Sequence, residues 1–247
     1  MATYVLVPTA CNGGWYMKGL VRPLEAAGHE VYRTTLTGVG ERSHLLSRDI
    51  GLETHITDVV NVLEYEDLRD VVLVGHSYGG VVARGVAERV PERIGQVVLI
   101  DSPVMRDGES VLNVLGPRMR EYLDMLTRTV GDGWQIPAGP VGTPNSLRTP
   151  HPTKTYADPI RIGNPRAAAL PHTYICCTLD KDPDQFYGEA LAISRERAVR
   201  SGWRYIEIEA THGVCRTHPQ ELAALLLAAA ESPVGTAPYS EGGASSR

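Results

Sequence analysis

The serine in the stretch "VVLVGHSYGGVV" (71–82) has a setting that suggests chemistry. An apolar run ends at Gly75, Ser77 follows two residues later, and two more glycines precede a second apolar run. The pattern Gly-x-Ser-x-Gly between a strand and a helix is typical of a tight turn that exposes the serine hydroxyl at the N-terminal end of the helix. A plain helix-capping serine is the alternative reading, but the apolar runs on both sides favour a nucleophile.

A serine hydroxyl attacks a carbonyl well only when a base takes its proton, and the chain has 8 histidines that could do so. His212 follows the strand-like run "RYIEIEA", so we expect it at the carboxyl end of a strand, as Ser77 is. His218 is the main competitor, although its place before Pro219 is typical of a helix start. His76 lies inside the turn, and its side chain should point away from the serine. The other histidines lack a position at a strand end: His29, His44, His55, His151 and His172.

An acid must orient the base and stabilise the imidazolium that forms during the reaction. Asp180 ends the strand-like run "TYICCTLD" and gives the chain order serine, acid, histidine that such a turn predicts. Asp182 lies two residues further on, and Asp101 ends another strand-like run, "QVVLID". We favour Asp180 and leave the other two open, since each of the three is otherwise a solvated loop carboxylate.

The negative oxygen of a tetrahedral intermediate needs preorganised N–H donors. One should be the backbone N–H of Tyr78, and the other should come from the loop "VPTACNGGW", where Ala10 is the candidate. Thr9 and Cys11 flank Ala10, so we expect them to contact substrate, with Trp134 as a more distant candidate.

The elements that position these residues alternate between strand and helix along the chain. Such alternation predicts an α/β fold with a mostly parallel sheet and helices on both faces. The segment at about 102–166 interrupts the alternation, and its length suits an inserted helical cap. We therefore expect one domain over residues 1–231 and a flexible C-terminal tail over 232–247. The expected strands are 3–7, 30–36, 70–75, 96–101, 173–179 and 204–210.

Composition narrows the class of partner. The 247 residues carry a net charge of -5 without a basic stripe, which argues against nucleic acid. No run approaches the ~18 apolar residues of a membrane span, and the start of the chain does not resemble a signal peptide, so we expect a cytoplasmic protein that binds no membrane. The 4 cysteines lack metal-ligand spacing, so we expect free thiols, no metal and no cofactor. Oligomeric state is left open, with a homodimer as one option.

With these residues in place, the chain resembles the α/β-hydrolase superfamily, in the branch of hydroxynitrile lyases, methyl-salicylate-type esterases and related bacterial esterases. The likeness is carried by "GWYMKGLVRPLEAAGHEVYRTTLTGVGERSHL", "DVVLVGHSYGGVV", "DSPVMRDGESVLNVLGP" and "THGVCRTHPQELAALL". The resemblance implies Ser77 as nucleophile, Asp180 as acid and His212 as base, with the N–H groups of Ala10 and Tyr78 as the oxyanion hole. It also implies a serine hydrolase that cleaves a small or medium carboxylic ester through an acyl-enzyme.

Two positions depart from the pattern of that branch. The first loop begins Pro8-Thr9 where the esterases usually have His-Gly, and a threonine there is similar to the lyases. The lyases, however, place a lysine directly after the catalytic histidine, and this chain has Gly213. The balance favours hydrolysis. The alternatives are a lyase or a natural-product tailoring enzyme on the same scaffold, or a small-molecule receptor.

Overall fold

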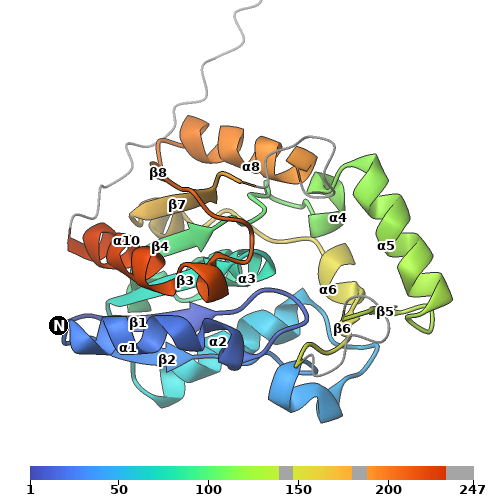
Figure 1. Ribbon diagram of the computed structural model, residues 1–247, viewed down its shortest axis with the longest axis horizontal. Helices are drawn as coiled ribbons and strands as arrows, with labels where there is room; N and C mark the ends of the chain where they lie inside the picture. Colours follow the sequence, from blue (N-terminus) through green and yellow to red (C-terminus); the bar gives the residue numbers. More distant parts are fainter. Residues whose placement is uncertain (139–146, 180–187, 232–247) are drawn as a thin grey trace, which may run out of the picture.

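The computed structural model describes residues 1–138, 147–179 and 188–231. Its centre is a 6-stranded sheet in the order β2-β1-β3-β4-β7-β8, in which every pair of neighbours is parallel. Because the strands are parallel, all of their carboxyl ends lie at one edge (Figure 1). The strands are β1 (Thr3–Val7), β2 (Glu30–Arg33), β3 (Val71–His76), β4 (Ile94–Ile100), β7 (His172–Cys177) and β8 (Arg204–Ile208).

Helices cover both faces of this sheet, as the alternating pattern predicts. One face carries α1 (Lys18–Ala26) in contact with α10 (Pro219–Glu231), which appear blue and red in Figure 1. The other face carries α2 (Leu52–Tyr65) and α3 (Tyr78–Arg89), which contact each other, together with α8 (Gly188–Arg200).

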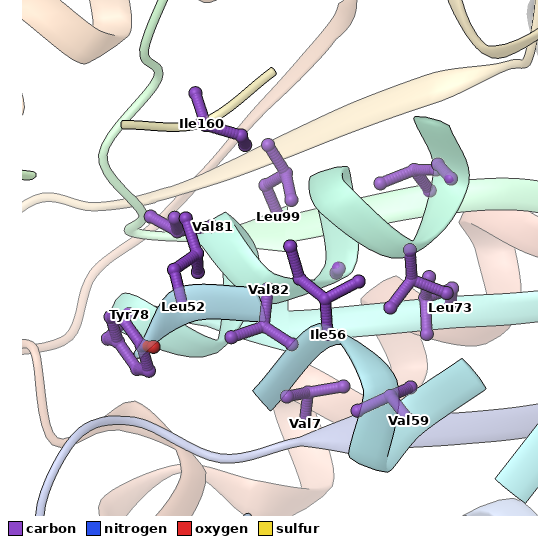
Figure 2. Packing of buried hydrophobic residues seen from close by; sticks show 14 of the residues in the cluster. Val7, Leu52, Ile56, Val59, Leu73, Tyr78, Val81, Val82, Leu99 and Ile160 are labelled. Atoms are coloured by element: carbon purple, nitrogen blue, oxygen red, sulfur yellow. The ribbon is translucent and has the colours of Figure 1, made fainter. Parts of the chain in front are cut away.

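The strand sequences explain why two layers form. Successive side chains of a strand point to opposite faces, so an all-apolar strand feeds two cores. In β3, Leu73 packs in the cluster beneath α2 and α3, whereas Val74 packs in the cluster beneath α1 and α10. Figure 2 shows the first cluster, with Val7 and Leu73 of the sheet close to Ile56 of α2.

The ends of the strands differ from the expected ones by up to three residues. β2 ends at Arg33, and the next residue, Thr34, donates both its N–H and its hydroxyl to the carbonyl of Leu6, each at 3.0 Å. Helix α1 continues through Pro23, since Leu20 and Leu24 bury its apolar side against the sheet. Short 3-10 helices lie at Gly14–Met17 (η1), Gly40–Leu45 (η2) and Pro91–Arg93 (η3).

Residues 102–166, called the cap below, are inserted between β4 and β7. The elements of this region are α4 (Val111–Val114), α5 (Pro117–Thr129), β5 (Gln135–Ile136), β6 (His151–Pro152), α6 (Lys154–Ala157) and α7 (Pro165–Ala168). The helices α4, α5 and α6 lie beyond one end of the sheet (Figure 1), whereas Gly163 and Asn164 run back to Glu88 of α3. The cap contains an antiparallel pair that its sequence does not predict, in which Ile136 is paired with His151.

Within the described ranges, none of the helices combines the length and the apolar character that crossing a bilayer requires. The expected tail at 232–247 falls outside those ranges.

Candidate active site

The turn between β3 and α3 holds Ser77 in a backbone conformation that few non-glycine residues adopt, with φ 54° and ψ -124°. Such strain persists only where the surroundings determine it, and it is common at functional sites. Here the N–H of Ser77 donates to the carbonyl of Ile100 at 2.9 Å. A Cβ on Gly75 would lie 2.4 Å from the Gly79 oxygen, and one on Gly79 would lie 2.3 Å from the Val7 oxygen. The glycines are therefore required by close chain contacts around the serine.

His212 lies in the loop between β8 and the short helix α9 (Val214–Thr217), and it lines the same cavity as Ser77. Its Nδ1 lies 2.7 Å from Oδ2 of Asp101. Asp101 directly follows β4 and is fully buried, with φ 45°. Its second oxygen accepts from the N–H of Cys177 at 3.4 Å. The arrangement joins a base to a buried carboxylate beside the strained serine.

The preference for Asp180 stays a prediction, while the described geometry favours Asp101, which the sequence left open. Asp180 and Asp182 lie outside the described residues, whereas Asp101 carries the hydrogen bond that a triad acid makes. The competing base, His218, is partly exposed, and its Nδ1 lies 2.8 Å from the hydroxyl of Thr217. It is not among the described residues that line the cavity.

The ring of His76 packs against the ring of His212, a contact that the sequence did not predict. Its ring is buried, stacks on Tyr16 at 5.6 Å and lies 4.8 Å from the His212 ring. Burial and the neighbouring His212 hold the pKa of His76 well below its usual range. A neutral ring thus packs against the base, where a second positive charge would oppose the imidazolium.

The loop after β1 contributes the opposite wall. Thr9, Ala10 and Cys11 line the cavity, and the backbone of Cys11 has φ 64°. The side-chain amide of Asn12 donates to the carbonyl of Ala10 at 2.8 Å and so fixes the loop locally. Burial raises the pKa of the Cys11 thiol to about 11, which keeps it protonated and unsuited to be a nucleophile.

The cavity has a volume of about 770 Å³. Apolar side chains of the cap form much of its wall, including Met119, Leu123 and Leu126 of α5. Trp134 is not among the described lining residues; its ring lies 5.6 Å from the guanidinium of Arg48. A contact of Trp134 with substrate stays a prediction from the sequence. Within the described ranges, no group of three or more histidine, cysteine or acidic residues could hold a metal ion.

The buried histidines predict a loss of stability in acid. Burial lowers the pKa of His55 and of His172 to about 4, against about 6.5 for an unfolded chain. Well above a pH of about 6.5 these histidines are neutral in both the folded and the unfolded chain, so they make no pH-dependent contribution to the free energy of unfolding. Below about pH 6.5 the unfolded chain binds protons that the folded chain excludes. The free energy of unfolding therefore falls by about 1.4 kcal/mol per pH unit for each histidine until about pH 4.

Urea denaturation at pH 7, 6 and 5 measures this loss. His172→Gln, which removes one of these groups far from the cavity, should give a shallower dependence than the parent. An unfolding free energy that stays constant from pH 7 to 5 would contradict the expectation.

Comparison with known proteins gives a consistent result. A family model described as "Alpha/beta hydrolase family" matches residues 4–225. A curated protein of Nocardioides sp. (strain SG-4G), named carbendazim hydrolyzing esterase, is 30% identical over 246 residues, which covers 92% of this chain and 99% of that protein. Salicylic acid-binding protein 2 of Nicotiana tabacum is 33% identical over 98 residues, covering 39% of this chain and 38% of that protein.

Among solved structures, an extracellular alpha/beta-hydrolase from a Paenibacillus species superimposes with a TM-score of 0.73. The match covers 93% of this chain and 99% of the other, at 23% sequence identity. At that identity the likeness establishes the fold alone.

Proposed function

This chain belongs to the alpha/beta hydrolase family, and we propose that it cleaves a carboxylic ester through an acyl-enzyme formed on Ser77, with His212 as base and Asp101 as acid. The esterases among its relatives make it a carboxylic ester hydrolase. One observation carries the assignment of residues. The Asp101 carboxylate holds Nδ1 of His212 at 2.7 Å, and His212 lines one cavity with a serine in strained backbone geometry.

The proposed reaction follows from that arrangement. With its Nδ1–H donated to Asp101, His212 carries no proton on Nε2, and this nitrogen accepts the proton of the Ser77 hydroxyl. The serine oxygen adds to the ester carbonyl, and the N–H groups of Ala10 and Tyr78 stabilise the negative oxygen. The imidazolium then protonates the leaving alcohol. Water activated by the same base hydrolyses the acyl-enzyme and frees Ser77.

The cavity supports a substrate of small or medium size with an apolar part. Its volume of about 770 Å³ and the apolar wall from α5 suit an alkyl or aromatic group beside the ester. The Nocardioides relative is named for hydrolysing carbendazim, so carbendazim is a substrate to test beside simple esters. A screen of acyl and alcohol chain lengths, with a fluorophosphonate label to trap the serine, tests the proposal. A ligand receptor would give at most a single turnover.

Hydrolysis and cyanohydrin cleavage are separated by the leaving group. Cyanide departs as an anion and needs a nearby cation in a dry site, whereas an alcohol takes its proton from His212. Gly213 supplies no charge at the position directly after His212, and Lys154 is paired with Asp158 at 2.7 Å. Arg148 and Arg216 also line the cavity, so the prediction rests on the missing lysine beside His212 and not on a cavity without cations. We expect turnover of short p-nitrophenyl esters and no cleavage of mandelonitrile above the uncatalysed rate.

Thr9→Gly is the matched variant for this prediction. Ester turnover should stay within roughly tenfold of the parent, because the threonine hydroxyl is not a required donor in acyl transfer. Fast cyanide release that Thr9→Gly abolishes would instead favour the lyase. Lys181→Ala extends the test to a lysine outside the described residues.

A further inference from the structure

We propose that His151, a buried residue of the cap, positions the oxyanion hole by holding the loop after β1 through the backbone of Cys11. The inference rests on the proposed acyl transfer at Ser77 and adds a positioning residue to it. His151 is not among the described residues that line the cavity, so any effect on the reaction must pass through its neighbours.

Two residues of the cap form hydrogen bonds with the backbone of Cys11, one with its N–H and one with its carbonyl. The N–H of Cys11 donates to Nδ1 of His151 at 3.3 Å, and its carbonyl accepts from the N–H of Thr149 at 3.0 Å. The hydroxyl of Thr149 in turn accepts from the N–H of Gly40 at 2.8 Å. Cys11 has φ 64° and directly follows Ala10, the proposed donor. A strained residue beside a donor is thus held by contacts from a segment about 140 positions away.

One tautomer of His151 satisfies all of these bonds. To accept from Cys11, Nδ1 must be unprotonated, so the proton lies on Nε2. That nitrogen lies 2.9 Å from the hydroxyl of Thr155, which itself donates to the carbonyl of Pro152 at 2.7 Å. The ring is fully buried, and desolvation holds the pKa of His151 well below its usual range. The acceptor for Cys11 is therefore maintained at neutral pH.

His151 also touches the residue that carries the second proposed donor. Its ring packs edge-on against Tyr78, with centroids 4.9 Å apart and planes at 77°. The hydroxyl of Tyr78 donates to Nδ1 of His55 at 2.8 Å, and Nε2 of His55 lies 2.9 Å from the carbonyl of Thr37. The Cys11 loop and Tyr78 therefore meet at one cap histidine, which can set the spacing of the two N–H groups.

Removing the acceptor should slow the chemical step without weakening substrate binding. Loss of an entire oxyanion donor costs about 10²- to 10³-fold in turnover, and a displaced donor should cost less. For His151→Leu we expect kcat to fall about 10- to 100-fold while KM changes by less than about threefold. For His151→Asn, whose side-chain oxygen can take the place of Nδ1, we expect kcat within about fivefold of the parent.

An aryl trifluoromethyl ketone provides the readout that a merely structural role would not move. The Ser77 oxygen adds to its carbonyl carbon, the serine proton passes to His212, and the resulting oxyanion occupies the hole. Its affinity should fall in His151→Leu by the same factor as kcat/KM. His172→Leu replaces another buried histidine, one stacked on Trp203 at 4.7 Å away from the site, and should leave kcat within about twofold.

Parent-like kcat and inhibitor affinity in a folded His151→Leu protein would overturn the inference, as would a change confined to KM. If the leucine variant does not fold, His151→Gln replaces it, because a glutamine reaches the Thr155 side but leaves Cys11 without its acceptor. The glutamine variant should then be slow and the asparagine variant fast, and equal rates would refute the role. A parent protein without serine-dependent turnover refutes the proposed function instead.

Discussion

Ser77→Ala should reduce ester turnover by on the order of 10⁶-fold while leaving the fold intact. The substitution removes the only atom that forms the acyl-enzyme in the proposed reaction. It adds no volume, and it replaces one non-glycine residue by another in the left-handed backbone conformation at φ 54°. The measurement is kcat on a short p-nitrophenyl ester, with circular dichroism as the check on folding.

A fluorophosphonate label makes the Ser77 test sharper. The parent should gain the mass of one label and Ser77→Ala none, because the label needs both the proposed base and the proposed oxyanion donors, which meet at Ser77. Ser47→Ala is the matched control, since that hydroxyl accepts from the N–H of Asp49 at 3.3 Å and is not among the residues that line the cavity in the described part of the chain. Activity in Ser77→Ala within about tenfold of the parent would rule out the covalent mechanism.

Asp101→Asn should reduce kcat by roughly 10⁴-fold. The amide can keep the contact with His212, but it favours the tautomer whose Nε2 carries a proton and cannot accept one from Ser77. Asparagine tolerates a positive φ better than most residues, so the backbone at φ 45° should remain as it is. Thermal unfolding measured beside kcat separates lost chemistry from lost stability.

Asp180→Asn and Asp182→Asn are the comparisons for the acid. Each should lose far less activity than Asp101→Asn, since His212 already has a buried carboxylate at 2.7 Å. If Asp180→Asn proves the most damaging of the three, the acid is Asp180 after all and the contact with Asp101 is only structural.

The sequence alone was sufficient for the fold class and for the placement of the serine turn and His212. The fold class and the serine turn each depend on patterns among neighbouring residues. Apolar runs such as Val71–Val74 are long and β-branched enough to require burial on both faces, which predicts a parallel sheet with two helical layers. The glycines around Ser77 mark a turn with no room for side chains, and the motif carries that geometry within five residues.

The choice of Asp101 as the proposed acid rests on tertiary structure. β4 and β7 are neighbours in the sheet, so Asp101 and Asp180 both follow strands that end at the same edge. A sequence pattern places a carboxylate at the end of a strand but does not give the direction of its side chain. That direction depends on the positive φ of Asp101 and on the path of the loop that carries His212, 111 residues away.

The contact between the cap and the site was likewise beyond the sequence. His151 lies in a Pro-rich stretch without periodicity, and its partner Cys11 is separated from it by 140 residues. Neither residue has a local pattern that requires the other. Only the folded cap, with β5 paired to β6, brings the ring to the backbone of the loop after β1. Periodic burial can be read from neighbouring residues, whereas a single hydrogen bond between distant segments depends on how the whole chain packs.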